Sequence, residues 1–152
     1  MSGSTDVPGP RELFERMRRH WLGVADVTEA EGDLLTEDVV LEMPFAAPGG
    51  PRRIEGREEV LAFTTPRRAA LPARLDEIRE LVVHETADPE VIVVEYEITG
   101  TSTATGHRAA LPFIGVLRAR GGRVAHWREY QNVAGIAEAL WGPSALSSGT
   151  GA

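Results

Sequence analysis

The chain has 152 residues, a formal net charge of −7, 42% hydrophobic residues and 26% charged residues. This length suits one domain with its own core, and the acidic balance argues against a nucleic-acid-binding surface. Every basic residue is an arginine and there is no cysteine, which excludes a Schiff-base lysine, a thiol nucleophile, a disulfide and a zinc–thiolate site. No signal-peptide core or membrane-length apolar run is present, so we expect a cytoplasmic protein without a membrane partner.

The N-terminal region predicts a tail followed by a helix. Residues 1–10 are rich in Gly, Ser and Pro, and we expect disordered tails at 1–10 and 143–152 around a single domain at 11–142. Apolar side chains at helical spacing predict a helix over 11–24. These side chains are Leu13, Phe14, Met17, Trp21 and Val24. His20 flanks the stripe, either lining a pocket or making a local hydrogen bond.

The next segment predicts a turn into the first strand. Thr28 and Glu31 have capping-box spacing, which predicts a short helix to about Leu35. A strand is then expected over 39–45. The following AAPGGP segment, residues 46–51, reads as a loop because its prolines and glycines do not fit regular structure.

The remaining elements are predicted mainly as strands. A short strand at 52–55 precedes a helix from Gly56 through Thr64 that Pro66 should end. Strands are then expected at 75–85, where helix competes in the first half, and at 91–99, 107–120 and 123–132, followed by a short helix at 133–141. Helices followed by consecutive antiparallel strands indicate an α+β fold. The arginines, including the pair Arg67–Arg68, are dispersed among acidic residues and are interpreted as solvated faces.

The densest chemistry follows Gly121 and Gly122, which predict a tight hairpin between 111–118 and 123–132. The second strand of this hairpin has two mixed faces. One face would carry Val124, His126, Arg128 and Tyr130, and the other Ala125, Trp127, Glu129 and Gln131. Periodicity alone leaves open which face is inside.

Two segments resemble the limonene-1,2-epoxide hydrolase group of the SnoaL-like, nuclear-transport-factor-2-like superfamily. They are LPFIGVLRARGGRVAHWREYQN (111–132) and LLTEDVVLEMPFAAPGGPRRIEGREEVLAF (34–63), and the resemblance covers most of residues 11–140. It implies a cone: a curved, largely antiparallel but mixed sheet wrapped around the N-terminal helices, an α+β barrel with a central pocket. Such a pocket suits a small hydrophobic molecule. The resemblance also implies a homodimer formed through the outer sheet face.

Glu129 is the first candidate for catalysis. It lies two residues after Trp127, so both side chains point to the same side of the strand. The resemblance places it where the hydrolases carry the aspartate that activates water. Apolar walls should raise the pKa of such a carboxylate and make it a better base near neutral pH. The alternative is a surface carboxylate paired with Arg128 or Arg118.

Glu42 and Tyr96 are candidate partners. By resemblance, Glu42 falls where the hydrolases carry an asparagine that helps to hold the water. A pair of carboxylates, Glu42 and Glu129, would have pKa values forced apart, giving one proton donor and one acceptor. Alternatively, Glu42 points outward between Leu41 and Met43. Tyr96 could donate a hydrogen bond to an oxyanion, or simply pack in the sheet.

The sequence also departs from the hydrolase pattern. The Arg and Asp that the hydrolases carry two residues apart fall at Tyr96 and Ile98, or at Glu95 and Glu97 if the alignment shifts by one residue. A tyrosine of the hydrolases falls at Val40. Most of the acid and water-holding machinery is therefore missing or replaced.

Together these features indicate a cofactor-free enzyme without a metal site, which uses carboxylate acid–base chemistry on a hydrophobic metabolite. The reaction would be a cyclisation, an isomerisation or an epoxide opening, with Glu129 as base and Glu42 or Tyr96 as its partner. The expected substrate-binding residues are Met17, His20, Val40, Ile98, Leu111, Phe113, Trp127 and Gln131. Two alternatives are a protein that binds a hydrophobic ligand without turnover and a protein whose curved sheet serves mainly to dimerise.

Overall fold

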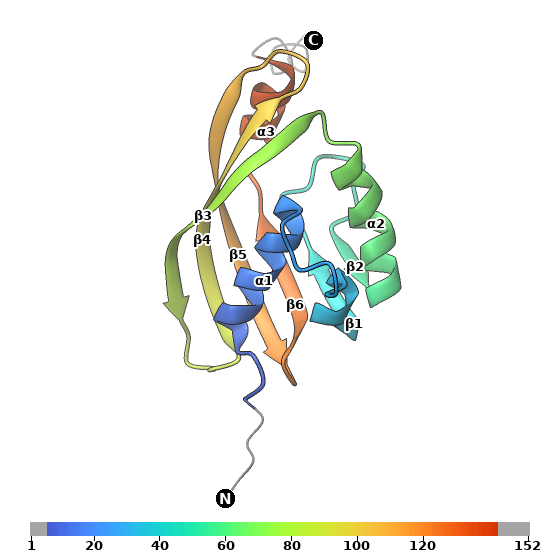
Figure 1. The fold of residues 1–152 in the computed structure, drawn as a ribbon, viewed down its shortest axis with the longest axis vertical. Helices are drawn as coiled ribbons and strands as arrows, with labels where there is room; N and C mark the ends of the chain where they lie inside the picture. Colours follow the sequence, from blue (N-terminus) through green and yellow to red (C-terminus); the bar gives the residue numbers. More distant parts are fainter. Residues whose placement is uncertain (1–5, 143–152) are drawn as a thin grey trace, which may run out of the picture.

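A computed structural model describes residues 6–142, which form a single curved six-stranded sheet with the first two α-helices on its concave side (Figure 1). The strand order is β2-β1-β6-β5-β4-β3, and every neighbouring pair is antiparallel except β1 and β6, which are parallel. The elements are α1 (Pro10–Leu22), the 3₁₀ helix η1 (Glu31–Leu34), β1 (Leu35–Glu42), β2 (Arg53–Glu55), α2 (Arg57–Ala69), β3 (Ala73–Glu85), β4 (Val91–Ser102), β5 (Arg108–Arg120), β6 (Arg123–Tyr130) and α3 (Val133–Trp141).

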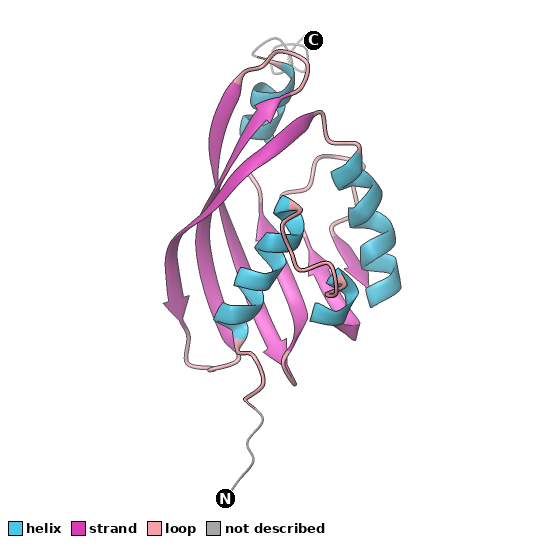
Figure 2. Ribbon diagram, viewed as in Figure 1, coloured by secondary structure: helices cyan, strands magenta, loops and turns pink. Residues whose placement is uncertain are grey.

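The sheet is strongly curved but open. Its long strands β3, β4 and β5 sweep across the molecule and wrap around α1 (Figure 2). Register shifts interrupt the β3–β4 and β5–β6 ladders, and such bulges increase the local bend and twist of a sheet. The predicted α+β cone is confirmed. Closure into a barrel is not, because β2 and β3 form the two edges of the sheet and do not pair with each other.

Helix α1 supplies the centre of the core. Leu13 and Phe14 are completely buried, and Met17 is nearly so. Pro10 occupies the first helical turn, where its missing amide costs no hydrogen bond. The helix ends at Gly23, whose left-handed φ of 73° suits glycine. The predicted helix over 11–24 is confirmed within two residues, although it begins inside the predicted tail. The remaining tail residues, 1–5 and 143–152, lie outside the described part of the chain.

The predicted capping box at Thr28 does not form. The amide and hydroxyl of Thr28 both donate to Asp26 Oδ1, at 2.8 and 2.6 Å, because an aspartate readily closes a turn two residues ahead. The short helix that follows is a 3₁₀ turn without a side-chain cap, and β1 begins directly after it at Leu35. This strand starts and ends earlier than the predicted 39–45.

Pro66 does not end the second helix. Helix α2 continues through it to Ala69, five residues beyond the predicted end at Thr64. A proline inside a helix costs one backbone hydrogen bond. Here contacts of the residues that follow Pro66 offset that loss. Arg68 forms an ion pair with Glu31 at 2.9 Å, and the amide of Ala70 donates to the Pro66 carbonyl oxygen.

The predicted Gly121–Gly122 hairpin is confirmed, because both residues have the positive φ, 60° and 78°, that this turn needs. A third glycine, Gly115 on β5, is required for a different reason. The indole of Trp127 lies directly over it, and a Cβ atom added there would be 2.0 Å from the ring. The inner surface of the sheet is thus shaped around Trp127.

None of the helices between residues 6 and 142 is long and apolar enough to cross a membrane.

Candidate functional site

A cavity of about 380 Å³ opens between α1, α2, β1 and the inner face of β6. Its walls are mostly aliphatic and aromatic, with a few polar groups, which is the usual character of a small-molecule site. The lining residues are Met17, Trp21, Glu31, Leu35, Val39, Val40, Leu41, Met43, Val60, Leu61, Phe63, Thr64, Arg67, Arg68, Leu71, Leu75, Ile98, Trp127, Glu129 and Gln131.

The structure shows which face of β6 points into the molecule. Trp127, Glu129 and Gln131 border the cavity, whereas His126 contacts Glu42 on the outer face. The β5–β6 register shifts between the pairs Arg118–His126 and Ala119–Val124. A bulge of this kind changes the alternation of side chains. It explains why Val124 and Trp127, three residues apart, are both buried.

Two side chains hold the carboxylate of Glu129. The hydroxyl of Tyr96 donates to Oε2, and the side-chain amide of Gln131 donates to Oε1 at 2.6 Å. The alternative pairing with an arginine does not occur, because Arg118 binds Asp88 at 3.0 Å and Arg128 lies near Glu42. Glu129 is therefore fixed in the cavity wall by neutral donors.

Tyr96 is completely buried in a cluster of aromatic rings. Its ring lies 5.3 Å from Phe14 and 5.4 Å from Phe113, with Trp21 and Trp127 each at 6.1 Å. Burial, followed by the negative charge of Glu129, raises the pKa of Tyr96 well above its ordinary value. The phenol thus stays protonated and donates to Glu129. Since Tyr96 does not line the cavity, its role in this geometry is to position Glu129.

The raised pKa of Tyr96 predicts a specific loss of stability in alkali. Tyrosine in the unfolded chain ionises near pH 10, whereas Tyr96 in the folded protein ionises only at higher pH. The stability that protonated Tyr96 contributes is therefore complete below pH 10. Above pH 10 the free energy of unfolding should fall by about 1.4 kcal/mol per pH unit. Urea unfolding between pH 9 and 11 should show this extra fall in the wild type and not in Tyr96→Phe.

Glu42 does not join Glu129. In the parallel β1–β6 pair, Glu42 is in register with Arg128, and neighbours in register share a face. Glu42 therefore lies on the outer face, where Oε1 is 2.5 Å from His126 Nε2 and 3.5 Å from Arg53. The predicted pair of carboxylates is wrong, and the outward alternative describes its position.

The other predicted binding residues divide into two groups. Met17, Val40, Ile98, Trp127 and Gln131 line the cavity. Phe113 instead stacks on Tyr96 in the core, and Leu111 packs against the same core without bordering the cavity. His20 does not line the cavity. It forms the local hydrogen bond that was the alternative prediction, with Nε2 at 2.9 Å from Glu29.

The wall that sequence reasoning missed belongs to α2. Val60, Leu61 and Phe63 have helical apolar spacing, but nothing in that spacing indicates what they face. Arg67 and Arg68, interpreted as solvated, border the cavity from the last turn of the same helix.

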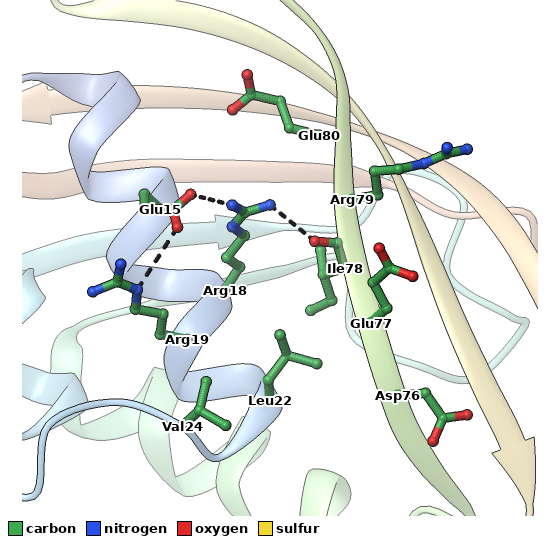
Figure 3. Close-up of a pocket in the computed structure, with 10 residues that line it drawn as sticks. All are labelled: Glu15, Arg18, Arg19, Leu22, Val24, Asp76, Glu77, Ile78, Arg79 and Glu80. Atoms are coloured by element: carbon green, nitrogen blue, oxygen red, sulfur yellow. Dashed lines mark hydrogen bonds and ion pairs between the residues drawn. The ribbon is translucent and has the colours of Figure 1, made fainter.

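A second, larger hollow of about 690 Å³ lies between α1 and β3 and is lined mainly by charged groups (Figure 3). Arg18 donates to the carbonyl oxygen of Ile78 at 2.9 Å and pairs with Glu15. Two other charged residues of β3 also have ion-pair partners: Asp76 pairs with Arg74, and Arg79 pairs with Glu97. We therefore assign the candidate site to the apolar cavity beside Glu129.

Comparison with known proteins agrees with this architecture. Residues 10–127 match the model of the SnoaL-like domain family, so the chain belongs to that family. An uncharacterized PhzA/B-like protein from Pseudomonas aeruginosa is 34% identical over 130 residues, covering 84% of this chain and 90% of that protein. The finer resemblance to the limonene-1,2-epoxide hydrolase group stays a prediction.

Solved structures share the fold. One from Bacillus subtilis, named "Putative Isomerase", has a TM-score of 0.75 and 24% identity and covers 88% of this chain and 93% of its own. Another from Pseudomonas putida, named a "putative polyketide cyclase", has a TM-score of 0.66 and 22% identity, with 88% and 98% covered. At these identities the likeness establishes the fold alone.

Proposed function

We propose that this protein is a cofactor-free isomerase or cyclase that moves a proton on a small, largely apolar carbonyl compound, with Glu129 as the base. The observation that carries the proposal is the carboxylate of Glu129, held by Tyr96 and Gln131 in the wall of an apolar cavity. The names of the Bacillus subtilis and Pseudomonas putida structures, an isomerase and a polyketide cyclase, support the same class of reaction.

The arrangement suits general base catalysis. Each oxygen of Glu129 accepts one hydrogen bond from the protein and keeps further lone-pair capacity for a substrate proton. The two donors fix its orientation, and the mostly apolar walls leave few other polar groups to compete for the carboxylate. Glu129 would take a proton from the carbon next to a carbonyl. In an isomerisation it would return that proton to another carbon. In a cyclisation the enolate carbon would bond to a second carbonyl carbon, and the alkoxide formed there would take the proton back from Glu129.

Epoxide opening fits the site less well. That reaction needs an acid for the epoxide oxygen besides a base for the water. Glu42 lies on the outer face, and the hydroxyl of Tyr96 is engaged by Glu129. Among the described residues that line the cavity, the other carboxylate is Glu31, which is paired with Arg68. We therefore favour a proton transfer that one base can carry out.

The test is proton exchange on carbon acids in D₂O. Bicyclic ketones such as 2-tetralone would first be screened for binding by thermal shift. Those that bind would then be followed by NMR for loss of the α-proton signal. The proposal expects saturable, protein-dependent exchange for at least one bound ketone. If several ketones bind and none exchanges faster than in buffer, the protein is better described as a non-catalytic binder of hydrophobic ligands.

We also propose that the chain forms a homodimer through the outer face of the sheet. Val82, Glu95, Ile114 and Tyr130 form one cross-strand row on that face, and Tyr130 packs against the exposed ring of Phe45. Phe45 is 61% exposed and Ile114 43% exposed, and clustered exposed apolar side chains commonly mark an interface.

The dimer proposal predicts that Ile114→Arg halves the mass in solution. Light scattering after size exclusion should give twice the 16.5 kDa chain mass for the wild type and the chain mass for the variant, because a buried, unpaired arginine is costly. Val24→Arg, just beyond α1 and on the concave side of the sheet rather than its outer face, introduces the same charge and should remain dimeric. A wild type that stays monomeric at 100 µM would contradict the proposal.

A further inference from the structure

We propose that the substrate of this cavity carries an anionic group, of which a carboxylate is the simplest, and that Arg67 binds it at the rim while the apolar body extends toward Glu129. This inference rests on the cavity of the proposed function and adds the class of compound that it takes. It follows from the charges that border the cavity and from how each of them is balanced.

The arginines of the last turn of α2 differ in one decisive way. Arg68 is already neutralised by Glu31, at 2.9 Å, in a partly buried ion pair that ties α2 to η1. Arg67 borders the same cavity, yet among the described residues no carboxylate lies within the 4.0 Å of an ion pair from its guanidinium, and no hydrogen bond engages it. A positive charge without a partner therefore stands at the cavity rim of a protein whose net charge is −7.

The guanidinium of Arg67 also lies over an aromatic ring. Its central carbon lies 4.1 Å from the centre of the Phe63 ring, and Phe63 is itself part of the cavity wall. Stacking of this kind orients the planar guanidinium and leaves its N–H donors at the edge. Those donors match the two oxygens of a carboxylate, which arginine commonly binds through two parallel hydrogen bonds. Arg67 therefore has donors available to bind a planar anion.

The opposite wall fixes the orientation of such a ligand. Glu129 lies on β6 and would repel an anion, whereas Arg67 lies on α2 and attracts one. The same cavity is lined by apolar side chains such as Leu61, Ile98 and Trp127, which provide the surface for a hydrocarbon body. A molecule with an anionic end and an acidic C–H bond at the other end would be bound in one direction. The acidic carbon would then face Glu129.

A matched pair of ligands tests this inference by binding alone. The probes are 2-naphthylacetate and the neutral 2-naphthylacetamide, titrated calorimetrically into the wild type, Arg67→Gln and Arg52→Gln. Arg52 is an exposed arginine outside the cavity lining, so its variant makes the same change in net charge. We expect the wild type to bind the acid about fivefold more tightly than the amide, the upper range for an exposed ion pair.

Arg67→Gln should abolish that preference by weakening the binding of the acid more than that of the amide, and Arg52→Gln should retain it. The preference should also shrink in 0.5 M NaCl, because salt screens an exposed charge. Equal affinity for the two probes, a preference that survives Arg67→Gln, or no binding of the acid would overturn the inference. Binding of the amide alone would overturn the anionic substrate but leave the cavity and the proton-transfer proposal in place. Failure of ketone exchange would instead reject the proton-transfer proposal without affecting the preference for the acid.

Discussion

Glu129→Gln is expected to slow ketone exchange at least about 100-fold, because a positioned general base typically contributes 10²–10⁴-fold to a rate. The substitution keeps the size and shape of the side chain. Its amide can still form hydrogen bonds with the Tyr96 hydroxyl and the Gln131 side chain, so the local structure has no reason to change. What it removes is the lone-pair basicity that accepts the proton. The exchange rate of a bound ketone, followed by NMR at saturation, measures this loss directly.

The matched control for that substitution is Glu42→Gln. It makes the same chemical change on a neighbouring strand, but on the outer face beside His126. Its exchange rate should stay within twofold of the wild type. An equal loss in both variants would mean that the effect is electrostatic or structural rather than that of a base at position 129. Thermal shift with the same ketone should show that Glu129→Gln still binds.

Trp127→Ala is expected to lower the free energy of unfolding by about 3–5 kcal/mol, the usual cost of truncating a buried large aromatic side chain. The indole is 6% exposed, lies 6.0 Å from the ring of Phe14 and 5.6 Å from that of Trp21, and covers Gly115. Its removal leaves an internal void next to Glu129. Urea denaturation, followed by far-ultraviolet circular dichroism, measures the change in stability.

Gly115→Ala provides the complementary control. In the wild type the added methyl group would meet the Trp127 ring, and overpacking of this kind typically costs about 1–3 kcal/mol. In the Trp127→Ala background the methyl group has space, so the same substitution should cost much less. A double-mutant cycle with additive effects would show that the indole is not what makes glycine necessary at this position.

The sequence predicted local features more reliably than relations between distant strands. The hairpin at Gly121–Gly122 follows from the backbone conformation that two glycines allow, and the stripe on α1 follows from helical spacing. The position of Trp127, Glu129 and Gln131 on one face follows from strand alternation. Which face is inside depends on packing against α1 and on a bulge near Ala125, and neither is encoded in spacing alone.

Glu42 illustrates the limit most clearly. At the end of its strand, Val39 and Leu41 are buried, whereas Val40 and Glu42 are partly exposed. Alternation alone does not show on which face of the sheet Glu42 lies, because that depends on the strand that pairs with β1. That partner is β6, paired in parallel and in register with Arg128. Arg67 was missed for a similar reason, because Pro66 predicted an end to the helix that places this arginine at the cavity.

The parallel pairing of β1 with β6 also has a consequence for the order of folding. Strands β3 to β6 pair with their neighbours in the chain, whereas Glu42 and His126, in contact across β1 and β6, are 84 residues apart. Pairings with large sequence separation form slowly, because their loop-closure entropy is lost before they gain contacts. We therefore expect the β1–β6 pairing to form last, and the cavity with it, because the cavity has walls from both strands. A bound ligand should therefore slow unfolding and leave the rate of folding almost unchanged.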